Sequence, residues 1–225
     1  MMKRIIAIDG PAASGKSTTA RLVAGKLGFL YLDTGAMYRA ITLKALESGV
    51  DVNDEKELEK LVKNSTINFQ NQDGVNRIRL DGKDVTEKIR DPQVDKNVSY
   101  VSMHQKVRSR LVEMQKRMGE ENNLVAEGRD TTTVVFPHAF KIYLDAELEV
   151  RARRRLLELK GRNITTTVDE QIQEITRRDK LDSERKTSPL LRDKDAVVVD
   201  TTHLTIEQQV DRVIQLFLQK TGKRA

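Results

Sequence analysis

Cysteine is missing from the 225 residues of this chain. Disulfide bonds and thiolate metal sites are therefore excluded, and nothing in the composition argues for export. Aromatic residues make up only 4% of the chain, and none of them lies in a basic repeat. A stacking platform for nucleic-acid bases is poorly supported, so we expect no nucleic-acid partner.

Long apolar runs are absent as well. No stretch approaches the roughly 18 residues that a membrane span requires. The first four residues, Met-Met-Lys-Arg, lead straight into a short apolar segment and do not fit a signal peptide. We therefore expect a cytoplasmic protein without a membrane partner. The three histidines (His104, His138 and His203) show no metal-ligand spacing and are interpreted as structural.

The chain has a formal charge of +6. This charge is compatible with nucleic acid, but a site for two polyphosphate ligands needs the same sign. The length suits one large domain, residues 1–225, with room for an inserted subdomain.

The most informative stretch is a match to G-x-x-x-x-G-K-[ST] at every fixed position. An apolar run, Ile5 to Ile8, precedes it, and a helix predicted from Ser17 to Leu27 follows and would stop at Gly28. In a P-loop the backbone N–H groups hold phosphate oxygens, Lys16 reaches the β- and γ-phosphates, and the Ser17 hydroxyl holds Mg²⁺. The predicted ATP-binding residues are Gly10, Pro11, Ala12, Ala13, Ser14, Gly15, Lys16, Ser17 and Thr18.

Four further apolar runs, at 29–32, 124–127, 140–144 and 196–199, alternate with helical patterns. Together with Ile5 to Ile8 they predict an α/β fold with a parallel five-stranded sheet flanked by helices. Residues 52–98 differ, because weakly alternating runs at 66–69, 77–80 and 83–85 indicate a small antiparallel insert, with Asp81-Gly82 as its hairpin turn.

Ligands of open α/β sheets gather at the carboxyl ends of the strands. Thr34, Tyr38 and Arg39 follow one predicted strand, and Arg129 and Asp130 follow another. The alternatives are an N-cap threonine beside a packed tyrosine, and a local salt bridge between Arg129 and Asp130.

Ser99 and Arg108 lie near the start of a helix predicted from His104 to Met118 and ended by Gly119. Asp145, at the end of the fourth strand, could face Mg²⁺ or cap the next helix, and the following residues favour the cap.

The densest basic stretch contains Arg151, Arg154 and Arg155, which share one helix face. A second helix, capped by Thr167 or Asp169, places Arg178, Asp182 and Arg185 on one face. A solvated basic face is the usual interpretation. Beside a P-loop, however, a helical flap with inward arginines suits a lid over phosphates, because phosphoryl transfer needs surrounding cations.

Four segments in order resemble the bacterial cytidylate kinases, within the nucleoside monophosphate kinases. They are GPAASGKST, LDTGAMYR, EGRDTTTVVFP and RRDKLDSER, and the similarity extends over essentially the whole chain. The resemblance implies a P-loop nucleoside monophosphate kinase fold. It also implies a monophosphate-binding region over 36–98, an antiparallel insert at about 64–90, and a lid with flanking helices over 151–185.

The resemblance implies transfer of the γ-phosphoryl of ATP to CMP or dCMP with Mg²⁺. We expect the protein to be a monomer, with Ser17 as the residue that binds the metal. The resemblance places Arg39, Arg129 and Arg185 at the CMP phosphate; Ser99, Arg108 and Asp130 at the base; and Arg178 and Asp182 at the sugar, with Thr34 and Tyr38 in the same pocket. The catalytic set would be Lys16, Arg129, Arg154 and Arg185. Two other interpretations stay open: a P-loop kinase for another acceptor such as shikimate, and an NTP-controlled switch that binds nucleic acid.

Overall fold

The computed structural model describes residues 3–72 and 75–222. Its centre is an all-parallel sheet of five strands in the order β2-β6-β1-β7-β8. The strands are β1 (Ile5–Asp9), β2 (Leu30–Asp33), β6 (Leu124–Gly128), β7 (Phe140–Asp145) and β8 (Val197–Asp200). The predicted fold class is confirmed, with strand bounds that differ from the sequence estimate by one residue or so.

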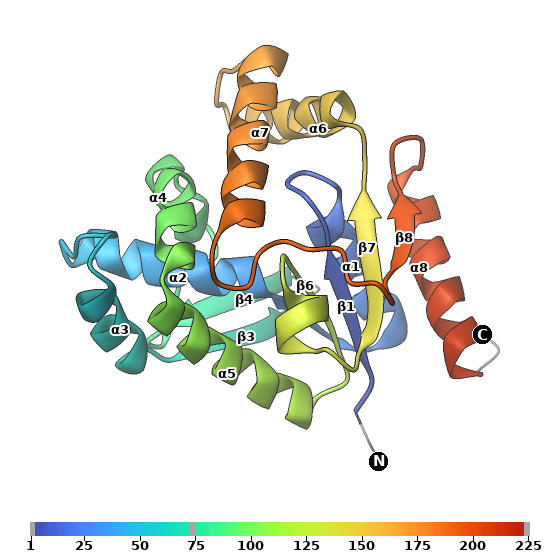
Figure 1. The fold of residues 1–225 in the computed structure, drawn as a ribbon, viewed down its shortest axis with the longest axis horizontal. Helices are drawn as coiled ribbons and strands as arrows, with labels where there is room; N and C mark the ends of the chain where they lie inside the picture. Colours follow the sequence, from blue (N-terminus) through green and yellow to red (C-terminus); the bar gives the residue numbers. More distant parts are fainter. Residues whose placement is uncertain (1–2, 73–74, 223–225) are drawn as a thin grey trace.

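Helices cover both faces of this sheet (Figure 1). On β1, Ile6 and Ile8 pack into a core shared with α1 (Lys16–Leu27) and α8 (Ile206–Thr221), whereas Ala7 faces the opposite core. That second core contains α2 (Thr34–Glu47), α3 (Glu55–Lys63) and α5 (Gln105–Glu121). Strands buried on both faces read as continuous apolar runs, which is why the sequence revealed them.

The register places polar residues together where the strands end. Asp9 on β1 lies beside Gly128 of β6 and Tyr143 of β7, and Asp33 on β2 lies beside Glu127. The carboxyl edge of the sheet therefore carries a row of polar groups just where the P-loop begins.

The predicted antiparallel insert is confirmed as a three-stranded sheet in the order β3-β4-β5. Its strands are β3 (Ile67–Gln72), β4 (Val75–Leu80) and β5 (Lys83–Asp84). Asp81 and Gly82 have φ values of 51° and 80°, as a two-residue hairpin with a primed turn requires. The insert leads through η1 (Lys88–Arg90) into α4 (Pro92–Met103), a helix that the sequence analysis did not predict.

Two local predictions were wrong. Helix α5 continues through Gly119 to Glu121. Gly119 lies inside the helix because a Cβ there would be 2.5 Å from Cε1 of Phe136, so its small size serves packing rather than termination. Asp145 does not cap α6 (Leu148–Lys160): the capping position is Glu147, and Asp145 Oδ1 accepts from the N–H of Ala146.

Helices α6 and α7 (Val168–Glu184) form a hairpin toward which the arrowheads of β7 and β8 point in Figure 1. Thr167 caps α7 in a capping box with Glu170, so threonine is the cap of the two candidates. Ala12 of the P-loop packs against Ala152 of α6 and Ile175 of α7. We call this element the α6–α7 hairpin. Among the helices in the described ranges, none is long and apolar enough to cross a membrane.

Candidate active site

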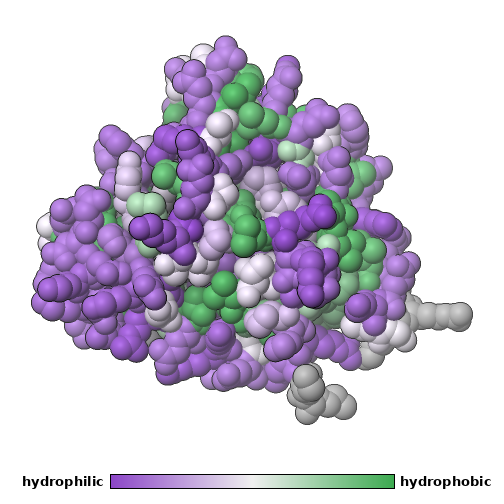
Figure 2. Space-filling model, viewed as in Figure 1, coloured by the Kyte–Doolittle hydropathy of each residue, from purple (hydrophilic) through white to green (hydrophobic). Residues whose placement is uncertain are grey.

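A cleft of about 1150 Å³ lies between the carboxyl edge of the sheet and the α6–α7 hairpin. The space-filling view shows the hairpin standing over a hollow with a mostly hydrophilic rim (Figure 2). The cleft brings together all the residues predicted for the monophosphate: Thr34, Tyr38, Arg39, Ser99, Arg108, Arg129, Asp130, Arg178, Asp182 and Arg185. Arg154 and P-loop residues 12–18 also line it, whereas Gly10 and Pro11 are buried at the start of the loop.

The P-loop has the backbone that its sequence demands. Gly10 has φ 152° and a Cβ there would lie 2.0 Å from the carbonyl oxygen of Leu144, so only glycine fits. Lys16 follows Gly15, which has φ 96°, and begins α1. Its ammonium nitrogen donates to the Pro11 carbonyl at 2.6 Å and to Ser14 Oγ at 3.4 Å. Burial, and then the charge of Arg129, lower the pKa of Lys16. The nearby carboxylates therefore do not fully compensate the positive charge of this ammonium group.

Ser17 points toward a carboxylate that the sequence analysis did not single out. Its hydroxyl donates to Glu127 Oε1 at 2.7 Å. Burial, and then the neighbouring Asp33, raise the pKa of Glu127. Within residues 3–72 and 75–222 there is no group of three acidic, histidine or cysteine residues arranged for a metal. A hydroxyl and one carboxylate nevertheless fit Mg²⁺, which takes its remaining ligands from water and substrate phosphates.

Asp9 supports the segment that carries Arg129 and Asp130. It is fully buried and accepts four hydrogen bonds, from the N–H and hydroxyl groups of Thr131 and Thr132, at 2.6–3.0 Å. These bonds hold the short π-helical turn η2 (Thr131–Val135) against the end of β1. Asp9 directly precedes the P-loop. It therefore fixes the P-loop and the segment that carries Arg129 and Asp130 relative to each other.

The part of the cleft beyond the P-loop is a network of arginines and aspartates. Arg108 Nη2 lies 2.5 Å from Asp130 Oδ2, and Arg129 Nε lies 2.9 Å from Asp182 Oδ2. Arg185 lies 3.8 Å from Asp130 and 3.7 Å from Asp182. Arg129 and Asp130 therefore do not pair with each other, and the local salt bridge considered from the sequence is not formed.

Arg178 is the exception in this network, because its side chain makes no hydrogen bond or ion pair among the described residues. Burial, and then the charges of Arg39 and Arg129, lower its pKa to about 10. Its Nε is buried without a hydrogen-bond partner, as are Tyr38 Oη, Arg108 Nε and Arg185 Nη2. Buried polar atoms normally have partners, so these four atoms indicate a site built for a polar, anionic ligand.

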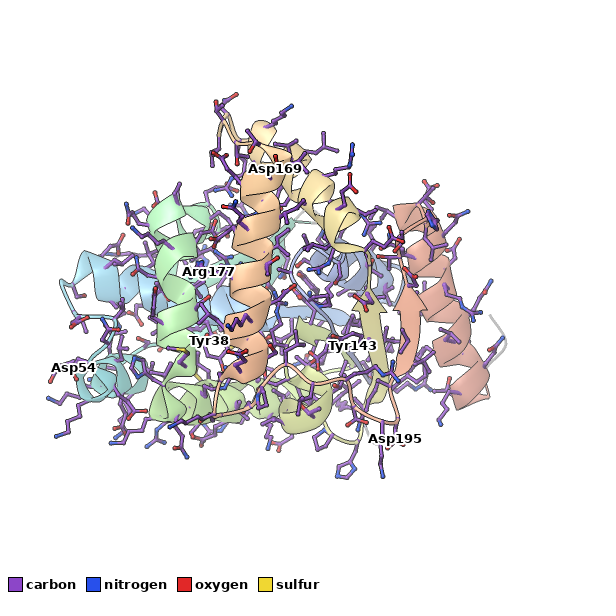
Figure 3. All side chains as sticks on the ribbon, turned by 45° about the horizontal axis from the view of Figure 1, so that its top comes forward. Tyr38, Asp54, Tyr143, Asp169, Arg177 and Asp195 are labelled. Atoms are coloured by element: carbon purple, nitrogen blue, oxygen red, sulfur yellow. The ribbon has the colours of Figure 1, made fainter. Side chains whose placement is uncertain are left out.

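Tyr38 lies deep in this part of the cleft. Its ring centroid is 5.1 Å from the guanidinium carbon of Arg108, a cation–π contact. Tyr38 and Arg177, both cleft residues, lie between α4 and α7 in Figure 3. Arg39 pairs with Asp95 of the unpredicted helix α4, and Arg155 lies 3.2 Å from the same carboxylate. Missing α4 therefore meant missing Asp95.

The far end of the cleft is formed by the β8–α8 connection. Arg154 donates to Thr201 Oγ1 at 3.0 Å and to the Thr201 carbonyl at 2.5 Å. Leu204, Thr205, Ile206 and Gln209 complete this end. The sequence analysis did not identify these four residues as part of the site. The capping pair of Thr205 and Gln208, which begins α8, was the sequence signal for a helix start at this position.

Comparison with known proteins agrees with this geometry. A family model described as cytidylate kinase matches residues 6–219. The cytidylate kinase of Caldanaerobacter subterraneus subsp. tengcongensis is 48% identical over 217 residues, which cover 96% of this chain and 95% of that protein. That of Bacillus pumilus is 46% identical, covering 95% of this chain and 96% of its own.

A solved structure of an uncharacterized protein from Eubacterium ventriosum ATCC 27560 aligns with a TM-score of 0.53 at 11% identity, covering 95% of this chain and 97% of the other. This last likeness supports the fold alone. The family model and these relatives match almost the full length of the chain, and the chain belongs to the cytidylate kinase family.

Proposed function

We propose that this enzyme transfers the γ-phosphoryl group of ATP to CMP or dCMP, giving ADP and CDP or dCDP. Membership of the cytidylate kinase family gives the reaction. The observation that carries the assignment of the site is the unpaired Arg178 among Arg39, Arg129 and Arg185, in the same cleft as the P-loop. A P-loop lysine and a separate set of buried arginines in one cleft suit two phosphorylated ligands.

The donor side is the P-loop. ATP phosphates would lie against the N–H groups of residues 13–17, with Lys16 at the β- and γ-phosphates. Ser17 and Glu127 would hold Mg²⁺, which neutralises charge on the phosphate oxygens when it is bound. The adenine would occupy the end of the cleft formed by Arg154 and the β8–α8 connection.

The acceptor side positions the monophosphate. We assign its phosphate to Arg39, Arg129 and Arg185, its sugar to Arg178 and Asp182, and its base to Ser99, Arg108 and Asp130. Asp130 is a suitable acceptor for the exocyclic amine of cytosine. Thr34 and Tyr38 line the same pocket.

The chemical step needs no nucleophilic side chain. An oxygen of the acceptor phosphate forms a bond to the γ-phosphorus while the bond to the bridging oxygen of ADP breaks. The side chains align the two phosphates and neutralise the charge that develops, with Lys16, Arg129, Arg154 and Arg185 as the catalytic set. Closure of the α6–α7 hairpin would exclude water from the transfer.

An assay of ADP formation against a panel of monophosphates tests this function. We expect ADP with CMP and dCMP, little with UMP, and almost none without an acceptor. ADP formation with shikimate alone would show another small-molecule kinase, and ADP formation stimulated only by nucleic acid would show an NTP-controlled switch. Light scattering of the same sample tests the proposal that the enzyme is a monomer.

A further inference from the structure

Asp179 on α7 connects the α6–α7 hairpin to the backbone of the P-loop. The N–H of Ala12 donates to Asp179 Oδ1 at 2.8 Å, and Arg151 Nη1 donates to Asp179 Oδ2 at 2.6 Å. The same Arg151 nitrogen donates to the carbonyl of Ala12 at 3.0 Å. Both polar groups of one P-loop residue are therefore held by this pair, one from α6 and one from α7.

The first consequence concerns Lys16. In a trans peptide the N–H and the C=O point in opposite directions, and none of the described peptides is cis. The Pro11–Ala12 peptide directs its N–H at Asp179 and its C=O at the Lys16 ammonium, which lies 2.6 Å away. Asp179 thus fixes the plane of the peptide to which Lys16 is anchored.

The second consequence concerns the phosphate cradle. Because the carbonyl of Ala12 points at Arg151, the N–H of Ala13 in the same peptide points the other way. Ala13 has φ 59°, a left-handed conformation that an alanine keeps only where its surroundings impose it. The bonds to the two sides of Ala12 supply that constraint.

We propose that Asp179, together with Arg151, is a positioning residue of the donor site, which sets the P-loop peptides and Lys16 when the α6–α7 hairpin lies over them. This proposal rests on the proposed function, because it assigns Asp179 to the ATP side of that reaction. On this proposal, the affinity for ATP depends on whether the α6–α7 hairpin lies over the P-loop. Asp179 also contributes to the field at Lys16 and favours its protonated form.

A purely structural role would differ in its consequences. Ala12, Ala152 and Ile175 already pack together without Asp179. If Asp179 only attached the hairpin, its loss would lower the melting temperature and affect both substrates alike. If it positions the P-loop, its loss acts on ATP.

The test variant is Asp179→Asn. Asparagine keeps the shape, but its carbonyl oxygen can replace only one of the two carboxylate oxygens, either Oδ1 at the Ala12 N–H or Oδ2 at Arg151. Its NH₂ group, which cannot accept, then faces the other donor. We expect a weaker Kd for Mg·ATP, measured by calorimetry without a monophosphate, and a lower kcat/KM for ATP, by up to about 100-fold for a misplaced group. The KM for CMP should stay within about twofold. The matched control is Glu184→Gln, an exposed carboxylate on the same helix, which should behave as wild type.

A double-mutant cycle with Arg151→Gln completes the experiment. Residues that act as one unit give losses that do not multiply, so the double variant should bind ATP about as weakly as either single variant. A folded Asp179→Asn with wild-type Kd for Mg·ATP, a loss confined to the KM for CMP, or multiplying losses would overturn the proposal. Should Asp179→Asn not fold, Arg151→Gln alone decides: an ATP-specific loss supports the proposal and an equal loss for both substrates refutes it. If the wild type forms no ADP with CMP, the proposed function fails, yet the Mg·ATP comparison still decides the role of Asp179.

Discussion

At the scale of single residues, Arg178 combines a proposed role in ligand binding with an unfavourable position in the free protein. Burial, and then the charges of the neighbouring Arg39 and Arg129, lower the pKa of its guanidinium to about 10, and its side chain makes no ion pair among the described residues. A buried cation without a partner is destabilising. The proposed ligand would supply the missing anion.

We therefore predict that Arg178→Met raises the melting temperature while it weakens CMP binding. Removing a repelled cation should stabilise the free enzyme, and each kcal/mol gained corresponds to about 2–4 °C at this size. The KM for CMP should rise at least about tenfold, since a charge-assisted contact is lost. Thermal melts and steady-state kinetics on one preparation measure both effects. A lower melting temperature would show that Arg178 has a stabilising partner in the free protein.

Lys16 leads to a prediction about protons. Its pKa is lowered in the free enzyme, first by burial and then by Arg129, and the phosphates of ATP would raise it again. The bound state then holds more protons than the free state, so ATP binding takes up protons above neutral pH and weakens as pH rises further. Calorimetry in buffers of different ionisation enthalpy measures this uptake.

The control for this measurement is Lys16→Met at the same Mg²⁺ concentration. Glu127 contributes with the opposite sign, and this contribution grows in the variant because Lys16 lowers the pKa of Glu127. The pKa of Glu127 is raised by burial and by Asp33, so this carboxyl would release a proton to the solvent when a cation binds to it. Uptake that persists unchanged in the methionine variant would assign the proton to another group.

Asp130 leads to a prediction about the base. In UMP an oxygen replaces the amine of CMP, so it would face the carboxylate without a hydrogen bond. Asp130→Asn can donate as well as accept, and it should narrow the CMP over UMP ratio of kcat/KM, mostly by losing CMP. A site built around a hydrogen bond discriminates by about 10⁴-fold at most, and we expect less here because water can enter.

Asp130 also pairs with the buried Arg108, so the melting temperature of the asparagine variant must be measured alongside. A lower melting temperature with an unchanged ratio in the folded variant would make Asp130 a structural partner of Arg108 only.

At the scale of elements, helix α5 shows that a glycine can either end a helix or allow close packing within it. Glycine ends many helices, and the sequence analysis interpreted Gly119 in that way. In the structure Gly119 lies within α5, against Phe136 and Ile5. Close packing across two elements, rather than the helix itself, determines this glycine.

Gly119→Ala should therefore destabilise the protein. Within a helix alanine normally gains about 0.5–1 kcal/mol over glycine, but here the added carbon would lie 2.5 Å from the Phe136 ring. Overpacking costs about 1–3 kcal/mol, so we expect a net loss in denaturant unfolding. The matched control is Gly25→Ala in α1, where an added Cβ would meet no atom within 4 Å apart from its chain neighbours and the backbone of its own helix, and a gain in stability is expected. Equal gains at both positions would show that the Phe136 ring moves aside freely.

At the scale of the whole molecule, the α6–α7 hairpin and the insert meet. Arg162 in the hairpin turn donates to the carbonyl of Arg90, which precedes α4. Arg90 Nη2 in turn lies 3.0 Å from Asp33 at the end of β2. Polar contacts between side chains and carbonyl or carboxylate groups thus link the hairpin, the insert and the sheet around the cleft.

We predict that ATP and CMP analogues together protect residues 159–168 from hydrogen exchange and proteolysis more than either ligand alone. In the proposed arrangement each ligand would contact a different wall of the cleft, so both would be needed for full closure. Exchange measured by mass spectrometry should leave helix α3 unchanged as an internal reference. Equal exchange of residues 159–168 with and without ligands would argue against a lid.

The sequence by itself determined the features that depend on local pattern. The P-loop needs glycine at Gly10 because of the approach of Leu144, and that need is visible as a motif. The buried strands appear as apolar runs, and the turn at Asp81-Gly82 has a local signature. Candidate site residues such as Arg129 and Asp130 could be chosen because they directly follow a strand, where parallel sheets gather their ligands.

Only the tertiary structure decided which of these groups meet. Asp130 pairs with Arg108 rather than with its neighbour Arg129, and Asp179 reaches Ala12, 167 positions away in the chain. Such contacts depend on strand order and on how α7 crosses the cleft. Periodicity within one segment carries no information about either, because it reports which face of an element is buried and not what that face is buried against.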